Sequence, residues 1–277
     1  MRFHLSMQLK NILKETVFFR VIVNSIKEAS AYRVNHLLSF LVILLPLIFV
    51  LALWDSVFTG KAMINGYSKS ALITYYILSI LLFDILYPGL NYNISSDIKD
   101  GKLSNFLIKP LDYLSYNFAL RAGINLMYSV SSLFLTFIFV LLFIDSFYFP
   151  SFWGLIFFFL SVFIAFILSY MISFTLSLIS FWTEEITWLN VLIDIIVPVA
   201  TGALIPVSFF PKTFSRIIYL SPFPYILNFP IDVYLSNRSD EEILSGFFIQ
   251  ILWLIIFYLA GKILWSYGLK KYQACGG

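Results

Sequence analysis

The first question for this chain is whether it carries residues that bind a nucleotide. A phosphate-binding loop needs a glycine at a fixed position before a Gly-Lys pair, so that backbone amides can surround the phosphates. The chain has three Gly-Lys pairs, and the required upstream positions hold Asp55, Ser96 and Ile256. The sequence therefore predicts that this chain does not hydrolyse a nucleotide through such a loop.

Residues for hydrolytic, metal or thiol chemistry are equally scarce. The two histidines, His4 and His36, lie near the start of the chain without partner motifs, and Cys275 is the single cysteine. A catalytic triad or a metal motif needs several such residues at defined spacings. The sequence predicts no catalytic residue, no metal site and no cofactor on this chain.

Two carboxylates interrupt otherwise apolar segments, at Asp84 and Asp194. Ionisable residues inside a membrane are candidates for a proton or cation site, or for the lining of a translocation path. A structural pair, or a position near the membrane surface, is the simpler interpretation of each. Asp84 lies only four residues before Pro88 and therefore fits a position near the inner surface.

Three serines, Ser169, Ser173 and Ser177, repeat at a spacing of four residues within one apolar segment. That spacing places them on one face of a helix. Small residues at this spacing let helices pack closely in lipid, which is the interpretation we favour. The alternative is a polar strip that faces a substrate path.

A polar, charged insert separates the second and third apolar segments. It has the pattern of a short amphipathic helix with Gly101 and Pro110 as its expected ends. Leu103, Phe106 and Leu107 share one face, which we expect to contact a cytoplasmic partner. The residues assigned to this contact, all within 94–112, are Ile98, Gly101, Leu103, Phe106, Leu107, Lys109 and Pro110.

The composition indicates an integral membrane protein. The chain is 60% hydrophobic and 12% charged, whereas soluble domains carry about 25% charged residues. A spanning helix needs about 20 mainly apolar residues. The predicted fold is all-α, a single transmembrane domain with six spans at residues 35–54, 70–90, 122–144, 152–180, 186–206 and 243–262.

The positive charges predict the orientation of these spans. Thirteen of the 18 Lys and Arg residues lie in the N-terminal segment, in or just after the insert, or at the C-terminal end. Segments on the cytoplasmic side are enriched in Lys and Arg. We therefore expect a multi-pass protein of the cell membrane with both termini and the insert in the cytoplasm.

Two further segments complete the predicted architecture. Residues 9–33 mix apolar and basic side chains, as in a helix that lies along the inner membrane surface; an ordinary helical lead-in to the first span is the alternative. Residues 207–240 are apolar but contain four prolines. We expect short helices of a re-entrant hairpin on the outer side there, because backbone inside lipid must satisfy its own hydrogen bonds.

The insert and the C-terminal tail resemble those of the membrane subunit of a type-2 ABC exporter. In the insert, the resemblance rests on Ile98, Gly101, Leu103, Leu107 and the Lys-Pro-Leu sequence at 109–111. In the tail, it rests on Gly-Leu-Lys-Lys-Tyr at 268–272 and on Gly276-Gly277. Lysine stands at positions 109 and 271, where arginine is frequent in proteins of this kind.

The resemblance implies an architecture and a division of labour. It implies an interfacial N-terminal helix, six spans, a coupling helix between the second and third spans, and a broken outer hairpin before the sixth. Two permease subunits, identical or homologous, would pair in the bilayer, and two separate ABC ATPase subunits would bind ATP and Mg. Closure of the ATPases would push on residues 94–112 and open the export path. No nucleic-acid partner is implied.

The main alternative function is an ion-coupled secondary transporter or channel. It would use Asp84 or Asp194, so transport would persist without an ATPase and would fail in Asp84→Asn. An intramembrane enzyme ranks last, because the chain lacks the paired acid and base residues that such an enzyme needs. The sequence does not indicate the substrate.

Overall fold

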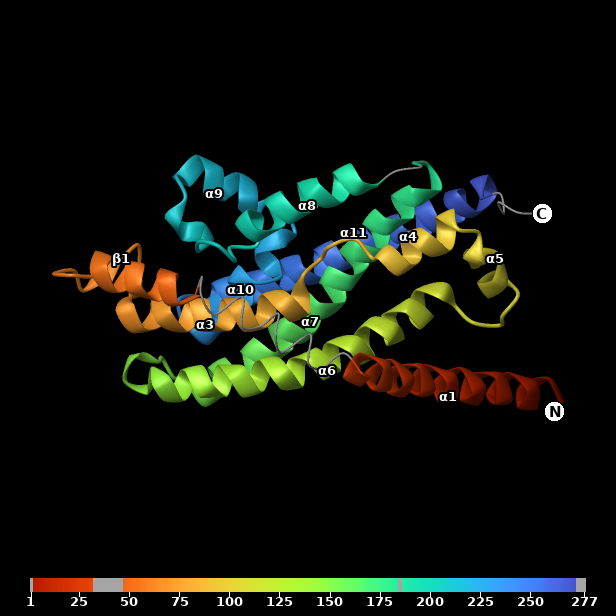
Figure 1. Cartoon of the computed structure of the whole chain (residues 1–277), viewed down its shortest axis with the longest axis horizontal. Helices are drawn as coiled ribbons and strands as arrows, with labels where there is room; N and C mark the ends of the chain where they lie inside the picture. The colour runs from red at the N-terminus through yellow and green to blue at the C-terminus, as the bar shows by residue number, and fades with distance from the viewer. Residues whose placement is uncertain (1, 32–46, 184–185, 273–277) are drawn as a thin grey trace.

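The computed structural model describes residues 2–31, 47–183 and 186–272, and these residues are almost entirely helical. His36 and Cys275 lie outside the described residues, as does most of the first predicted span. Figure 1 shows long helices that run roughly along one axis. The amino end of α1, the carboxyl end of α11 and the short helices α4 and α5 lie at the same end of that axis, and the β-hairpin lies at the other.

The elements follow one another with short connections. The longer described helices are α1 (Arg2–Ala31), an apolar helix at Leu47–Val57, α3 (Lys69–Leu86), α6 (Tyr113–Leu142), α7 (Phe152–Ser177), α8 (Thr187–Ala200) and α11 (Asp240–Lys271). The shorter elements are β1 (Met63–Ile64), β2 (Tyr67–Ser68), α4 (Tyr92–Lys99), α5 (Lys102–Leu107), η1 (Ile144–Ser146), η2 (Leu178–Phe181), η3 (Val207–Phe209), α9 (Lys212–Tyr219), η4 (Phe223–Tyr225) and α10 (Asn228–Tyr234).

Four of the described helices are long and apolar enough to cross a membrane: α3, α6, α7 together with η2, and α11. The prediction of an all-α protein with several apolar helices is confirmed at this level. The predicted fifth span, residues 186–206, contains α8, which has only 14 residues. Such a helix is about 21 Å long at 1.5 Å per residue. It ends early because Pro198 has no amide hydrogen and Gly202 takes a φ of 83°.

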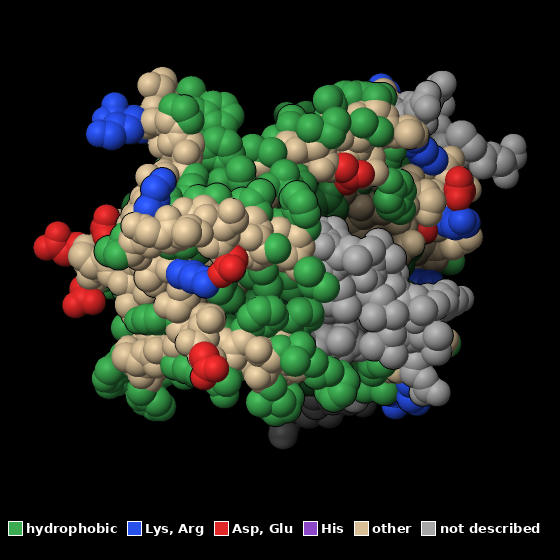
Figure 2. Space-filling model, turned by 60° about the vertical axis from the view of Figure 1, so that its left-hand side comes forward, with side chains coloured by type: hydrophobic (Ala, Val, Ile, Leu, Met, Phe, Trp, Pro, Cys, Tyr) green, Lys and Arg blue, Asp and Glu red, His purple; other side chains and the backbone are tan. Residues whose placement is uncertain are grey.

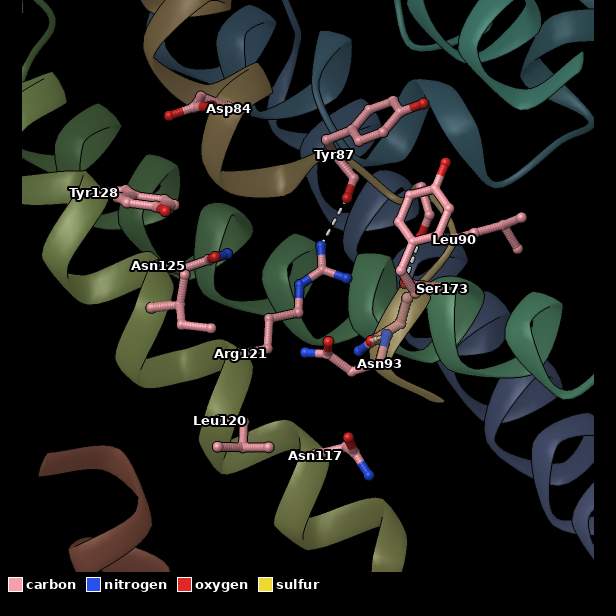
Figure 3. Close-up of a pocket in the computed structure, with 14 residues that line it drawn as sticks. Asp84, Tyr87, Leu90, Asn93, Asn117, Leu120, Arg121, Asn125, Tyr128 and Ser173 are labelled. Atoms are coloured by element: carbon pink, nitrogen blue, oxygen red, sulfur yellow. Dashed lines mark hydrogen bonds between the residues drawn. The ribbon is translucent and has the colours of Figure 1, made fainter. Parts of the chain in front are cut away.

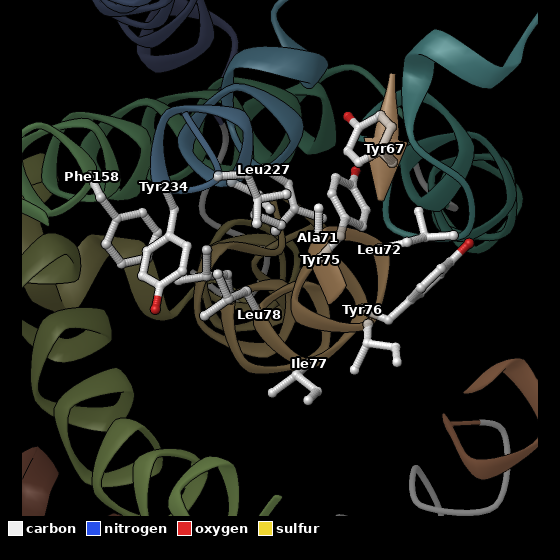
Figure 4. Close-up of a cluster of buried hydrophobic side chains, with 14 of the residues drawn as sticks. Tyr67, Ala71, Leu72, Tyr75, Tyr76, Ile77, Leu78, Phe158, Leu227 and Tyr234 are labelled. Atoms are coloured by element: carbon white, nitrogen blue, oxygen red, sulfur yellow. The ribbon is translucent and has the colours of Figure 1, made fainter. Parts of the chain in front are cut away.

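Helix α3 is the centre of the bundle. In its most apolar stretch 67% of the residues are buried, compared with 6% in α6 and 11% in α11. Its side chains Leu72, Tyr75 and Leu78 belong to the main buried cluster. Leu227, next to α10, and Phe158 of α7 complete this cluster around α3 (Figure 4).

The surface of the bundle is correspondingly apolar. Figure 2 shows hydrophobic side chains over much of the visible face, with charged side chains scattered singly or in small groups. Exposed apolar side chains on α6 include Phe134 and Phe137, which are 62% and 59% exposed. An apolar surface of this extent needs a bilayer or another subunit to cover it.

Glycines let α11 lie close against its neighbours. A Cβ at Gly246 would overlap the ring of Phe229 in α10, and a Cβ at Gly268 would overlap the ring of Phe181 in η2. Small residues permit this close helix contact in a membrane protein, where van der Waals packing holds helices together.

A buried ionic network holds the region that was predicted to lie on the outer side. Asp232 of α10 accepts hydrogen bonds from the Tyr67 hydroxyl (2.6 Å) and the Asn228 amide (2.6 Å). The Arg238 guanidinium donates to the same carboxylate (2.9 Å). Burial and the Asp232 carboxylate raise the pKa of the Tyr67 hydroxyl, which therefore stays protonated and keeps donating. The network joins residues 228–238 to the start of α3.

Replacement of Arg238 by Met tests this network. We expect the variant to lose about 3–5 kcal/mol of unfolding free energy, because Asp232 is left buried without its cation. The double variant Asp232→Asn/Arg238→Met removes both charges and loses less. The measurement is the unfolding midpoint of the purified protein in detergent, with the exposed Arg216→Met as the matched control. Equal midpoints for Arg238→Met and Arg216→Met would contradict the assignment.

Candidate functional site

The insert between α3 and α6 folds as two short helices that meet at Gly101. Helix α4 begins after Asn91, whose side-chain oxygen accepts hydrogen bonds from the amides of Asn93 (3.1 Å) and Ile94 (3.3 Å). Gly101 has a φ of 75°, which glycine adopts without strain, and α5 starts at the next residue. Pro110 follows the end of α5. The insert thus contains α4 in addition to the one helix that the sequence predicted.

The exposed surface of the insert differs from the predicted contact face. Leu103 and Phe106 are 0% and 8% exposed, and Ile98 is also buried. The bend at Gly101 lets α5 pack on aromatic side chains of the same chain, which bury its apolar face. Leu107 is 45% exposed and its neighbour Ile108 is 85% exposed. Sequence reasoning missed Ile108, because helical periodicity does not place it on the apolar face.

An aromatic layer and the C-terminal tail hold α5. The rings of Phe106 and Tyr113 lie edge to face with centroids 4.9 Å apart, and Tyr113 stacks on Trp265 of α11 at 4.9 Å. The hydroxyl of Tyr272 accepts a hydrogen bond from the backbone amide of Ser104 (3.2 Å). The tail motif that ends at Tyr272 therefore contacts the insert directly.

The serine stripe of α7 holds the segment that links α3 to α4. The Ser173 hydroxyl donates to the Gly89 carbonyl, and the Ser177 hydroxyl accepts a hydrogen bond from the Asn91 amide (2.7 Å). Both serines are buried, as is Ser169. Buried backbone groups need such partners. The stripe thus binds backbone of the same chain besides allowing close packing.

Arg121 of α6 holds the same segment from the other side. Its guanidinium donates to the Tyr87 carbonyl (2.7 Å) and to the Ser169 hydroxyl (3.2 Å). Figure 3 shows the hydrogen bond to Tyr87. In the sequence, Arg121 is one of the positive charges just after the insert, and it carries no further mark of a role. No spacing marks it, because its acceptors are a backbone carbonyl and a hydroxyl from distant segments.

The two carboxylates that interrupt the apolar segments both lie near Tyr87, since Asp194 is hydrogen-bonded to it and Asp84 lines the same cavity. Asp194 of α8 accepts hydrogen bonds from the Tyr87 hydroxyl and from the Asn190 amide (3.2 Å). Asp84 is exposed on the last turn of α3. Among the described residues, no group of three or more His, Cys, Asp or Glu side chains lies close enough to hold a metal ion.

A polar cavity of about 410 Å³ lies between α3, the start of α4, α6 and α7. In Figure 3, Arg121 lies in the middle of the drawn residues that line this cavity. The polar side chains that line it come mainly from the α3–α4 connection and from α6. They are Asp84, Tyr87, Asn91, Tyr92, Asn93, Asn117, Arg121, Asn125, Tyr128 and Ser173.

Comparison with known protein families decides the class of this molecule. The family described as ABC-2 family transporter protein matches residues 13–276. The chain belongs to this family. The match spans the insert, the bundle and most of the tail, and it confirms the resemblance to type-2 ABC permeases. No curated protein and no solved structure matches the chain.

The family identifies the kind of membrane subunit to which the insert belongs. An ABC-2 permease is a multi-pass membrane subunit that associates with ABC ATPase subunits. In this ABC-2 permease, the insert has a defined position, because α7, α11 and the tail all bind it.

The contact between the tail and the insert can be tested with Tyr272→Phe. The variant loses one of the two acceptors of the Ser104 amide, the other being the Gly101 carbonyl (3.2 Å), and we expect a loss of up to about 1 kcal/mol in unfolding free energy. Hydrogen exchange of the amides in α5 should become faster, because that helix loses one of its attachments. Tyr267→Phe, which removes an exposed hydroxyl from α11, is the control. Unchanged exchange in α5 would refute the contact.

Proposed function

We propose that this chain is the membrane subunit of an ATP-driven ABC exporter and that the α4–α5 insert couples it to separate ATPase subunits. ATP and Mg are bound by those subunits, since the sequence has no phosphate-binding loop. Two ATPase subunits serve a pair of permease subunits, identical or homologous, and the export path lies between them. The observation that carries the proposal is the exposed tip of the insert.

That tip runs from Leu107 to Pro110 and is exposed throughout. Leu107 (45% exposed) and Ile108 (85% exposed) are adjacent, and together they form a small apolar patch on a polar insert that a partner can cover. Lys109 lies over the Phe106 ring at 5.8 Å, which orients its charge beside the apolar tip. An apolar centre flanked by a cation suits a groove on an ATPase.

Attachment of the insert to the bundle supports its role in coupling. Leu103 and Phe106 contribute by anchoring α5 in the core, and Gly101 by permitting the bend. Ile98 anchors α4 in the same buried cluster. A push on the tip then moves the ends of α7 and α11 instead of deforming a loop. We assign contact to Leu107, Ile108, Lys109 and Pro110, and anchoring to the buried residues.

The proposed topology has six spans, with both termini and the insert in the cytoplasm and residues 207–240 re-entrant on the outer side. The charge distribution supports this orientation. The basic, apolar sequence of α1 supports a place at the inner membrane surface. Its packing beside α6, roughly along the common axis of the long helices in Figure 1, favours the alternative of a helical lead-in to the first span.

The double variant Leu107→Asp/Ile108→Asp tests the coupling surface. Two charged side chains replace the apolar tip, and we expect the ATPase to bind at least about tenfold more weakly. The measurement is vanadate-sensitive ATP hydrolysis in the complex purified through the tagged permease. Leu107→Met/Ile108→Val keeps the apolar surface and should retain the ATPase.

An intact complex in the Asp variant would rule out the tip as the docking surface. Transport that continues after removal of the ATPase, and that stops in Asp84→Asn or Asp194→Asn, would favour the ion-coupled alternative. The hydrogen bond between Tyr87 and Asp194 is the feature that would then need to respond to protonation.

A further inference from the structure

The cavity around Arg121 has a positive character that the coupling role does not require. Both hydrogen-bond acceptors of the guanidinium, the Tyr87 carbonyl and the Ser169 hydroxyl, are neutral. These bonds leave the charge of Arg121 at the cavity wall without neutralising it. Among the described residues that line the cavity, Asp84 is the one carboxylate, and in Figure 3 it points away from Arg121.

A second feature of the cavity favours an anion. Helix α4 begins at the cavity, where Tyr92 and Asn93 line the wall. The amino end of a helix carries a partial positive charge and attracts anionic groups. The Asn93 side chain is exposed there and offers an amide donor. The Asn91 side chain already accepts hydrogen bonds from the Asn93 and Ile94 amides, so the start of α4 contributes its partial positive charge and the Asn93 side chain to the space that Arg121 faces.

A second cavity adjoins the first on the side that faces α1. This neighbouring cavity of about 370 Å³ shares Asn93, Leu120, Ile124 and Tyr128 with the first and reaches Ser25, Glu28 and Ala29 of α1. Glu28 is exposed and lies on the α1 side of this second cavity, away from the Arg121 cavity that it does not line. This second cavity is also lined by Tyr116, which in turn borders a groove of about 460 Å³ between α1 and α6. The side chains of that groove are mainly apolar: Val17, Phe18, Phe19, Val21, Leu111, Tyr116 and Ala119, with Asp112 and Ser115.

We propose that this track binds an amphipathic phosphate, with the phosphate at Arg121 and the apolar part in the groove between α1 and α6. A guanidinium is well suited to a phosphate, because its planar array of donors matches the phosphate oxygens. The track runs from a charged cavity through a polar cavity to an apolar groove. This order matches the order of groups in a phospholipid. A free phosphate fits the first compartment but leaves the groove unused.

Binding is measured on the purified permease alone in an uncharged detergent, so that its outcome does not depend on ATPase coupling. The probes are short-chain phosphatidic acid, inorganic phosphate and an added uncharged amphiphile, octyl glucoside. Each is titrated while the unfolding temperature is recorded, because a ligand of the folded state raises that temperature. Phosphatidic acid should act at a concentration at least about tenfold lower than either of the other two.

Two variants separate the phosphate site from the structural role of Arg121. Arg121→Gln removes the charge and also alters the bonds to the α3–α4 connection. Asn93→Glu leaves those bonds in place and puts a carboxylate at the cavity. Its control is Asn237→Glu, which puts the same charge at an exposed asparagine that does not line the cavity. Both Arg121→Gln and Asn93→Glu should weaken phosphatidic acid binding by about tenfold, whereas Asn237→Glu should bind like the unmodified chain.

Three results would overturn the proposal. Equal action of inorganic phosphate would show that the groove is not used, and equal action of octyl glucoside would show that the phosphate is not recognised. Unchanged phosphatidic acid binding in Asn93→Glu would show that the molecule binds elsewhere. None of these results bears on whether the insert docks an ATPase.

Discussion

Backbone groups in the short segment between α3 and α4 must find hydrogen-bond partners inside the protein, and the end of the subunit that carries the insert is arranged to supply them. Where apolar surroundings replace water, an unpaired carbonyl is costly. Arg121 satisfies the Tyr87 carbonyl and Ser173 satisfies the Gly89 carbonyl. Since α4 starts immediately after this segment, the same bonds determine where the insert lies relative to α6 and α7.

At the other end of α3, a buried polar group is likewise paired inside the protein, and there the group and one of its partners are charged. Asp232 is buried near the β-hairpin and is stable there because Tyr67, Asn228 and Arg238 all donate to it. Both ends of the central helix are therefore held by specific polar contacts. Its middle is held by apolar packing and by further hydrogen bonds, among them those from the Tyr75 hydroxyl to the Gly202 carbonyl (2.7 Å) and from the Ser79 hydroxyl to the Ala203 carbonyl (3.2 Å). Contacts along its whole length suit a helix that must keep its place while helices around it face lipid.

Composition and apolar runs predicted the class of protein and the long helices, because a run of bilayer length has few other uses. The insert and tail motifs predicted the family. The contacts were less predictable, since periodicity shows that a face is apolar but not what covers it. Leu103 and Phe106 illustrate this, because their own chain covers them. Arg121 and the backbone partners of Ser173 and Ser177 could not be predicted, as these contacts join segments far apart in the sequence.

Helix α11 contacts both ends of the subunit without a break. Near its start, Gln250 donates to the Tyr225 carbonyl (2.7 Å) and Gly246 lies against Phe229. Near its end, Trp265 stacks on Tyr113, and the helix spans 32 residues, about 48 Å, with no proline. A single unbroken helix therefore joins the insert at one end of the subunit to the α10 region at the other, so that neither region can shift along the axis of the bundle independently of α11.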